Sequence, residues 1–208
     1  MKIQNLQLKK LNITALFDKI DQSLITSERI RDLFDLKAPD RANTPFIELP
    51  GTKVLIIPTL KKEVVIEPNR LRVSDASTED PAKSKVIGDF EKAYKAFSGK
   101  STLRAYGYNY DISLQLQEDI SYDKLLSPSL KSLVNGGNLL EAGARVVYSK
   151  AGRKFDMQIV PSGQEKQLEV HANVHYDKTE KIDFTKLAKE LLADYKEIEQ
   201  AINKFVKG

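Results

Sequence analysis

The clearest hydrophobic pattern in the chain lies in its last segment. Apolar residues recur at three- and four-residue steps over residues 182–208, from Phe184 to Val206, which predicts one long amphipathic α-helix. Asp183 is placed to cap the first turn of this helix. Such an apolar stripe needs a broad apolar surface to lie on, so we expect the helix to pack on a β-sheet formed by earlier segments.

Alternating and β-branched segments before the helix predict the strands of that sheet. The first segment alternates over residues 6–17, with a shift of phase at Lys9 and Lys10 that indicates either one long strand with a bulge or two short strands. Short apolar runs bounded by proline, glycine and asparagine then follow, which is typical of an antiparallel meander. The further strands are predicted at residues 46–49, 53–57, 63–67, 71–74, 102–116, 144–148, 155–161 and 168–176.

Helical spacing returns in three other places. A helix over residues 81–97 is predicted to begin at Asp80-Pro81, because proline suits the first helical position. A short helix begins near Thr26 and is expected to end at Pro39. Residues 121–134 suit another short helix.

These elements predict a single α+β domain over residues 1–208. Residues 46–98 and 140–207 would each be a meander followed by a helix, which indicates a possible structural repeat. We expect the antiparallel strands to form one large sheet or two adjoining sheets, with the helices at 81–97 and 183–206 on the same side.

The amino-acid composition mainly excludes certain kinds of site and partner. The chain has no cysteine, so disulfides, thiolate metal sites and a cysteine nucleophile are excluded. Its 33 basic and 29 acidic residues are interspersed and give a net charge of +4, whereas a committed nucleic-acid binder usually shows a denser basic block. No segment reads as a membrane-spanning helix or a secretory signal. We therefore expect a cytoplasmic protein that does not associate with membranes.

The candidate catalytic and metal-binding residues have simpler explanations. His171 and His175 are four apart in a predicted strand, about 13 Å along the chain, which is too far for one metal ion. Asp156 and Glu169 could face each other across a hairpin, but polar positions on a water-facing sheet explain them equally well. The sequence therefore predicts no catalytic residue, no metal site and no cofactor.

One row of side chains permits two interpretations. Tyr106, Tyr108 and Tyr110 follow one face of a predicted strand at steps of about 7 Å. Beside basic residues they would form a possible binding surface of the kind that stacks the bases of single-stranded nucleic acid. The basic residues are Arg104, Lys150, Arg153 and Lys154. The same face continues into Ile112 and Leu114, which favours the alternative that the rings form the rim of the core.

The order of elements resembles that of known proteins. A meander ending in EPNRLRVSD, a long strand reading YGYNYDISLQL and a closing amphipathic helix look like a scattered group of uncharacterised proteins. More distantly, this order is similar to the antiparallel sheet-plus-helix layout of SecB-like export chaperones. The resemblance covers most of the chain in element order and implies that layout, but it carries no functional residue. The basic charge balance departs from the acidic chaperones.

We therefore expect a non-catalytic interaction or assembly module. Long strands leave edges that must be paired or protected, which favours a homo-oligomer or a protein partner. Binding of single-stranded nucleic acid through the tyrosine row is the alternative function. A hydrolase whose active site the sequence hides is the third.

Overall fold

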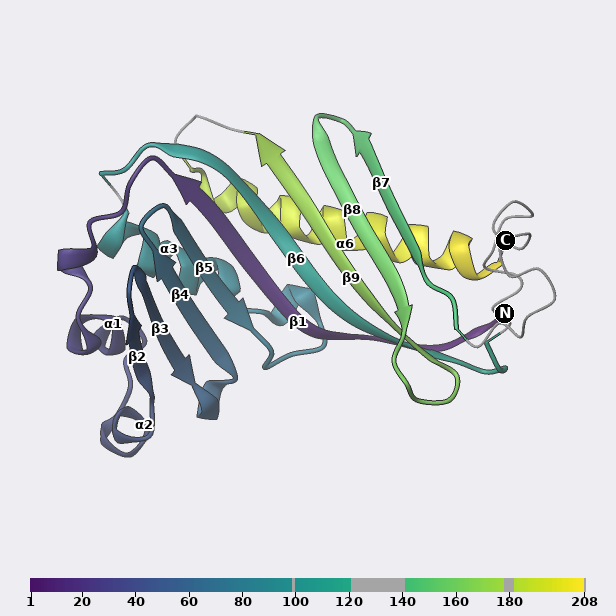
Figure 1. The fold of residues 1–208 in the computed structure, drawn as a ribbon, viewed down its shortest axis with the longest axis horizontal. Coiled ribbons are helices and arrows are strands. Elements are labelled where there is room, and N and C mark those ends of the chain that lie inside the picture. The colour runs from purple at the N-terminus through teal and green to yellow at the C-terminus, as the bar shows by residue number, and fades with distance from the viewer. Residues whose placement is uncertain (99, 121–140, 178–181, 208) are drawn as a thin grey trace.

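The computed structural model contains one antiparallel sheet of nine strands in the order β2-β3-β4-β5-β1-β6-β9-β8-β7 (Figure 1). The structure describes residues 1–98, 100–120, 141–177 and 182–207. The strands are β1 (Ile3–Phe17), β2 (Phe46–Leu49), β3 (Thr52–Ile57), β4 (Lys62–Glu67), β5 (Arg70–Asp75), β6 (Leu103–Leu116), β7 (Ala144–Lys150), β8 (Arg153–Pro161) and β9 (Gln167–Asp177). The bulge predicted in the first strand is present, between Leu8 and Lys10.

Short and long helices connect and cover these strands. The helices are α1 (Ser27–Leu33), α2 (Ala38–Ala42), α3 (Val86–Phe97) and α6 (Phe184–Lys207), and the 3₁₀ segments are η1 (Gln22–Leu24), η2 (Pro58–Leu60) and η3 (Pro81–Lys83). The predicted α+β class is confirmed, with all strands in one sheet. Within the described ranges, no helix is long and apolar enough to cross a membrane.

The sheet is built from two halves that meet at its centre. The long strands β1 and β6 pair with each other in the middle. Outward from β1 lie β5, β4, β3 and β2, and outward from β6 lie β9, β8 and β7. Each half therefore consists of a long central strand, a meander that returns from the edge to the centre, and a helix. This is the meander-plus-helix arrangement expected from the sequence.

The two main helices lie on the same face of the sheet. Figure 1 shows α6 crossing the half that contains β6 to β9, while α3 lies behind the other half. The side chain of Asp183 caps α6 by accepting from the backbone nitrogens of Thr185 and Lys186 at 3.0 and 3.1 Å. The helices also meet through aromatic rings, because Phe184 lies 5.6 Å from Tyr94 between ring centroids. One continuous core therefore lies between the sheet and both helices.

Two helix boundaries differ from the sequence prediction. The helix expected from residue 81 is divided into η3 and α3. The carboxylate of buried Asp75 accepts from the Ser84 hydroxyl and the Lys85 nitrogen, at 2.7 and 3.1 Å, and holds the intervening backbone in a bend. Pro39 does not end the first helix but lies in the first turn of α2, where its missing N–H costs nothing. The helix predicted at 121–134 lies outside the described residues.

Candidate functional site

The sheet has one covered face and one open face. Side chains alternate between the two faces along each strand, so the residues between the core positions of β1, β6 and β9 point away from the helices. Three of these residues are asparagines at the same level of the sheet: Asn12, Asn109 and Asn173. The open face is therefore polar where the covered face is apolar.

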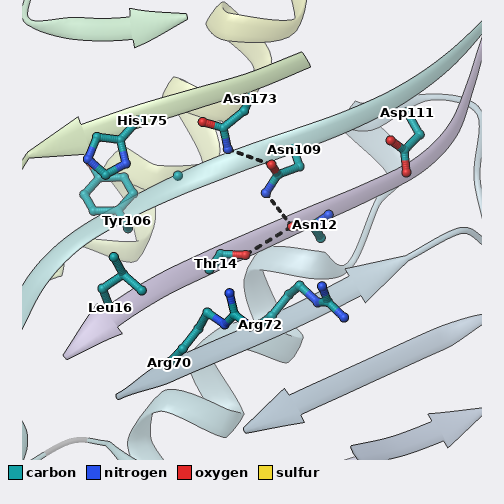
Figure 2. Close-up of a pocket in the computed structure, with 11 residues that line it drawn as sticks. Asn12, Thr14, Leu16, Arg70, Arg72, Tyr106, Asn109, Asp111, Asn173 and His175 are labelled. Atoms are coloured by element: carbon teal, nitrogen blue, oxygen red, sulfur yellow. Dashed lines mark hydrogen bonds between the residues drawn. The ribbon is translucent and has the colours of Figure 1, made fainter. Parts of the chain in front are cut away.

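The three asparagines form a ladder of amide hydrogen bonds. Asn109 donates from Nδ2 to Oδ1 of Asn12 over 2.7 Å, and Asn173 donates from Nδ2 to Oδ1 of Asn109 over 2.6 Å (Figure 2). A one-residue slip of any of these strands would move its asparagine to the apolar face. The ladder therefore specifies the register of the three central strands.

A hollow of about 450 Å³ lies beside this ladder on the open face. Gly107 lines the hollow and is paired with Thr14 on β1 and with His175 on β9. Because glycine has no side chain, the space between these two residues is unfilled. A Cβ atom at Gly107 would lie 2.7 Å from the carbonyl oxygen of Val174. The close approach of β6 to β9 therefore requires glycine here, whether or not a ligand enters the hollow.

The arginines of the hollow are already engaged. Arg70 and Arg72 extend toward it from β5 (Figure 2). Arg72 donates to Glu63 over 2.9 Å, and Arg70 donates to Glu67 over 2.6 Å. Partly exposed pairs of this kind contribute little stability, about 1 kcal/mol or less, but they neutralise the charge that an anionic ligand would need.

A second, smaller hollow of about 310 Å³ contains the nearest approach to catalytic chemistry. His171 contacts Asp111 through Nδ1 at 2.8 Å. None of the residues lining the hollow carries a hydroxyl, a thiol or an amine that this histidine could activate. Hydrogen bonds from Arg145 lower the pKa of Asp156, which suits an ion pair and not a general acid.

The structure also separates the carboxylates that the sequence placed together. Asp156 lies opposite Asn173, and Glu169 lies opposite Val160, so the two do not face each other across the β8–β9 hairpin. Among the residues that the structure describes, no three histidine, aspartate or glutamate side chains gather as metal ligands.

The predicted tyrosine row lies under α6. Tyr108 and Tyr110 are fully buried, and their hydroxyls donate to the backbone carbonyl oxygens of Leu187 and Leu191 at 3.0 and 2.8 Å. These hydroxyls attach the centre of the sheet to the helix. Their rings present no open face on which a base could stack.

Tyr106 belongs to a buried polar cluster at the same interface. Its hydroxyl donates to Glu190 over 2.6 Å, and the hydroxyl of Tyr176 donates to Asp194 over 2.7 Å. Arg153 forms an ion pair with Asp194, which is completely buried. Burial raises the pKa of Asp194 to about 6, although Tyr176 and Arg153 lower it. The cluster joins α6 to β6, β8 and β9.

The basic residues proposed beside the tyrosines do not form one surface. Arg153 is held by Asp194 on the covered face, whereas the neighbouring Lys154 is exposed and lies opposite His175 in β9. Lys150 donates to Glu197 of α6 over 2.7 Å, and Arg104 is exposed on β6. The structure thus brings Arg153 and the tyrosines to one interface and leaves the other basic residues apart.

The two edges of the sheet differ in how they are protected. Edge strand β2 has four residues and lies between Pro45 and Pro50. Short length and flanking prolines restrict the addition of another strand. Ile47 and Leu49 are exposed on this strand, but little backbone is free around them.

Edge strand β7 lacks those protections. It has seven residues, ARVVYSK, with no proline, and among the described strands it pairs only with β8. Val146 and Val147 are 44% and 50% exposed on consecutive positions, and therefore on opposite faces of the strand. The ring of Tyr148 stacks on that of Phe155 in β8, with 4.9 Å between the ring centroids.

Neither protein-family models nor curated proteins match this chain. The sequence did not indicate the exposed edge residues Val146 and Val147 as a candidate surface. The sequence shows two consecutive valines. In an amphipathic strand these residues point to opposite faces, so we would expect one of the two to be buried. Both valines are exposed because β7 is an edge strand. The strand order cannot be predicted from the local sequence pattern.

Proposed function

We propose that this protein is a non-catalytic assembly module that binds a second copy of itself by strand addition at β7. The observation that supports the proposal is the open β7 edge, with its row of backbone N–H and C=O groups and two exposed valines. A strand of a partner can satisfy those groups and cover the valines in one step. Without a partner, such an edge invites unspecific aggregation.

The charges on β7 do not guard this edge. Arg145 is bonded to Asp156 at 2.6 and 2.9 Å, and Lys150 is bonded to Glu197. Lysine and arginine protect an edge when their charges would have to be buried or opposed on pairing. Here both charges are already paired within the chain, so they oppose the approach of a second strand only weakly.

A second copy of β7 fits the edge by symmetry. Two antiparallel β7 strands related by a two-fold axis at Val147 would place that valine against itself, Val146 against Tyr148, and Arg145 against Ser149. No like charges face each other in this register, and apolar pairs stand at its centre. One strand pair buries less area than the standard interface of roughly 1,600 Å², so we expect a dimer of micromolar affinity.

The other functions receive less support. Nucleic-acid stacking would need the rings of Tyr106, Tyr108 and Tyr110 to be accessible, and they are buried under α6. Hydrolysis by a nucleophile that His171 activates would need a hydroxyl or a thiol beside it, and the lining of that hollow provides neither. Of the two edges formed by the described strands, β7 has the longer row of backbone groups without a neighbouring strand.

Sedimentation velocity over a range of protein concentrations tests the proposal. We expect the wild-type chain to change from monomer to dimer, and Val147→Lys to remain monomeric, because pairing across the two-fold axis would bring two lysines together. Ile47→Lys is the matched control, since it places the same charge on the exposed edge β2. A monomer at all concentrations would contradict the proposal, as would equal dimerisation of wild type and Val147→Lys.

A further inference from the structure

A cavity of about 440 Å³ lies between α6 and the segment around η3, where the two halves of the molecule meet. It is separate from the open face and from the β7 edge. Its walls are partly apolar, formed by Leu6 of β1, Pro81 of η3 and Leu192 of α6. The cavity therefore offers space and apolar contact for a short alkyl chain.

Two polar groups of α6 face this cavity without a partner. Tyr195 is 7% exposed, its ring lies 5.8 Å from that of Tyr110 between centroids, and its hydroxyl has no hydrogen-bond partner within the described part of the chain. Glu199, one turn further along α6, forms no hydrogen bond or ion pair through its carboxylate with any residue the structure describes. The mostly buried side chain of Tyr195 and the partly buried side chain of Glu199 carry polar groups that proteins normally pair with another protein group or with water.

Further carboxylates make the cavity negative. Asp80 and Glu79 also line it, together with the basic Lys196. Asp80 lies 3.7 Å from Lys83, and Glu79 accepts from Gln7. Burial, together with the negative charges of Glu199 and Asp80, raises the pKa of Tyr195 to about 12. Burial also raises the pKa of Glu199, and the neighbouring Lys196 lowers it. Burial is the main cause of both shifts, and the shift of Tyr195 also indicates that carboxylates lie close to its hydroxyl.

We propose that this cavity binds a primary ammonium group carried on a short alkyl chain. The ammonium would donate to the carboxylate of Glu199 and to the oxygen of Tyr195, with Asp80 adding negative potential. The alkyl chain would lie between Leu6 and Leu192. Free alkylamines and the side chain of a lysine share this chemistry, and the site is independent of assembly through β7.

Titration of the full-length chain with n-butylammonium chloride, followed by two-dimensional ¹H–¹⁵N NMR, tests the site. We expect saturable shifts of the amides in residues 192–199 and 80–82, and binding at least about 10-fold weaker for n-butanol, which has the same tail without the charge. Comparison of 1,4-diaminobutane with an Nα-acetylated lysine amide then identifies the kind of ligand. Tighter binding of 1,4-diaminobutane would indicate a free amine, and tighter binding of the lysine amide would indicate a lysine side chain. Equal binding of butanol and butylammonium would overturn the proposal, as would the absence of shifts.

Three single substitutions assign the roles. Glu199→Gln should weaken butylammonium binding about 10-fold, and Tyr195→Phe about 3-fold, because each removes one acceptor while keeping the shape of the side chain. Glu197→Gln is the control on the same helix, since Glu197 bonds Lys150 and does not line the cavity. Thermal melts of all three establish that they fold. Unchanged affinity in folded Glu199→Gln would overturn the assignment, and so would an equal loss in Glu197→Gln.

Discussion

The two halves of the sheet share one plan but attach their helices by different chemistry. In the first half, α3 is attached to β4 by a buried ion pair between Asp89 and Lys62. In the second half, the hydroxyls of Tyr108 and Tyr110 donate to backbone carbonyls of α6, in addition to the ion pair between Arg153 and Asp194. A buried ion pair costs desolvation on both sides, whereas a neutral hydroxyl buries a large ring and needs one acceptor. The same arrangement of elements thus tolerates two quite different interfaces.

The halves differ at their edges as well. The first half ends in the short strand β2, which Pro45 and Pro50 enclose, and the second ends in the longer strand β7 with Val146 and Val147 exposed. A repeated plan needs protection of both outer edges if the protein is to stay monomeric. An open edge in only one half would favour the proposed closed two-fold assembly over growth from both ends.

Among substitutions that test the difference between the two halves, we expect the largest loss of stability at Tyr108. Tyr108→Ala should lower the free energy of unfolding by about 4 kcal/mol, because it removes a fully buried ring between β6 and α6. Tyr108→Phe keeps the ring and should cost only about 1 kcal/mol, for the hydrogen bond to Leu187. Urea unfolding followed by circular dichroism measures both values. A loss below about 1 kcal/mol for the alanine variant would show that the second half does not depend on this contact.

The ion pair of the first half should respond in a different manner. Lys62→Met leaves Asp89 buried without its partner and should cost about 3 kcal/mol. Replacing both residues, as Lys62→Met with Asp89→Leu, should recover most of that loss, since no charge then remains in the interface. Urea unfolding of the single and double variants provides the comparison. If the double variant is less stable than the single one, the ion pair is a net source of stability.

Much of the fold could be predicted from local patterns. The alternation around Tyr108 indicates its strand and its apolar face, and the spacing from Phe184 to Val206 indicates α6 with Asp183 as its cap. These features depend on neighbours in the sequence, which is why they are visible there. The break between η3 and α3 is not, because it depends on Asp75, whose carboxylate reaches Ser84 and Lys85 from another element.

The candidate sites were largely hidden for the same reason. The tyrosine row was visible, but its burial depends on α6, which lies about 80 residues further along the chain. The pairing of Asn12, Asn109 and Asn173 requires the order of three strands. Val147 becomes an edge residue only through the order of the whole sheet, and no local pattern encodes that order.

The smallest expected effect concerns the buried acid of the second half and appears as a dependence on pH. Burial raises the pKa of Asp194 from 3.8 to about 6, so the folded state binds this proton more tightly than the unfolded state. The resulting stabilisation is fully present below pH 3.8 and is lost as the pH rises through 6, by about 2–3 kcal/mol. Asp194→Asn has no such proton to lose.

The free energy of unfolding of the wild type minus that of Asp194→Asn should therefore fall between pH 4 and pH 6 and stay level above about pH 7. Urea unfolding of both proteins at four pH values measures this difference, and the other titrating groups cancel in it. Asp156→Asn is the control of opposite sign, because Arg145 lowers the pKa of Asp156 and its stabilisation is lost as the pH falls. A difference that does not change with pH would mean that Arg153 and Tyr176 fully compensate the burial of Asp194. In that case each helix would be attached to the sheet by a fully compensated ion pair. The two halves would then differ only in the hydrogen bonds of Tyr108 and Tyr110.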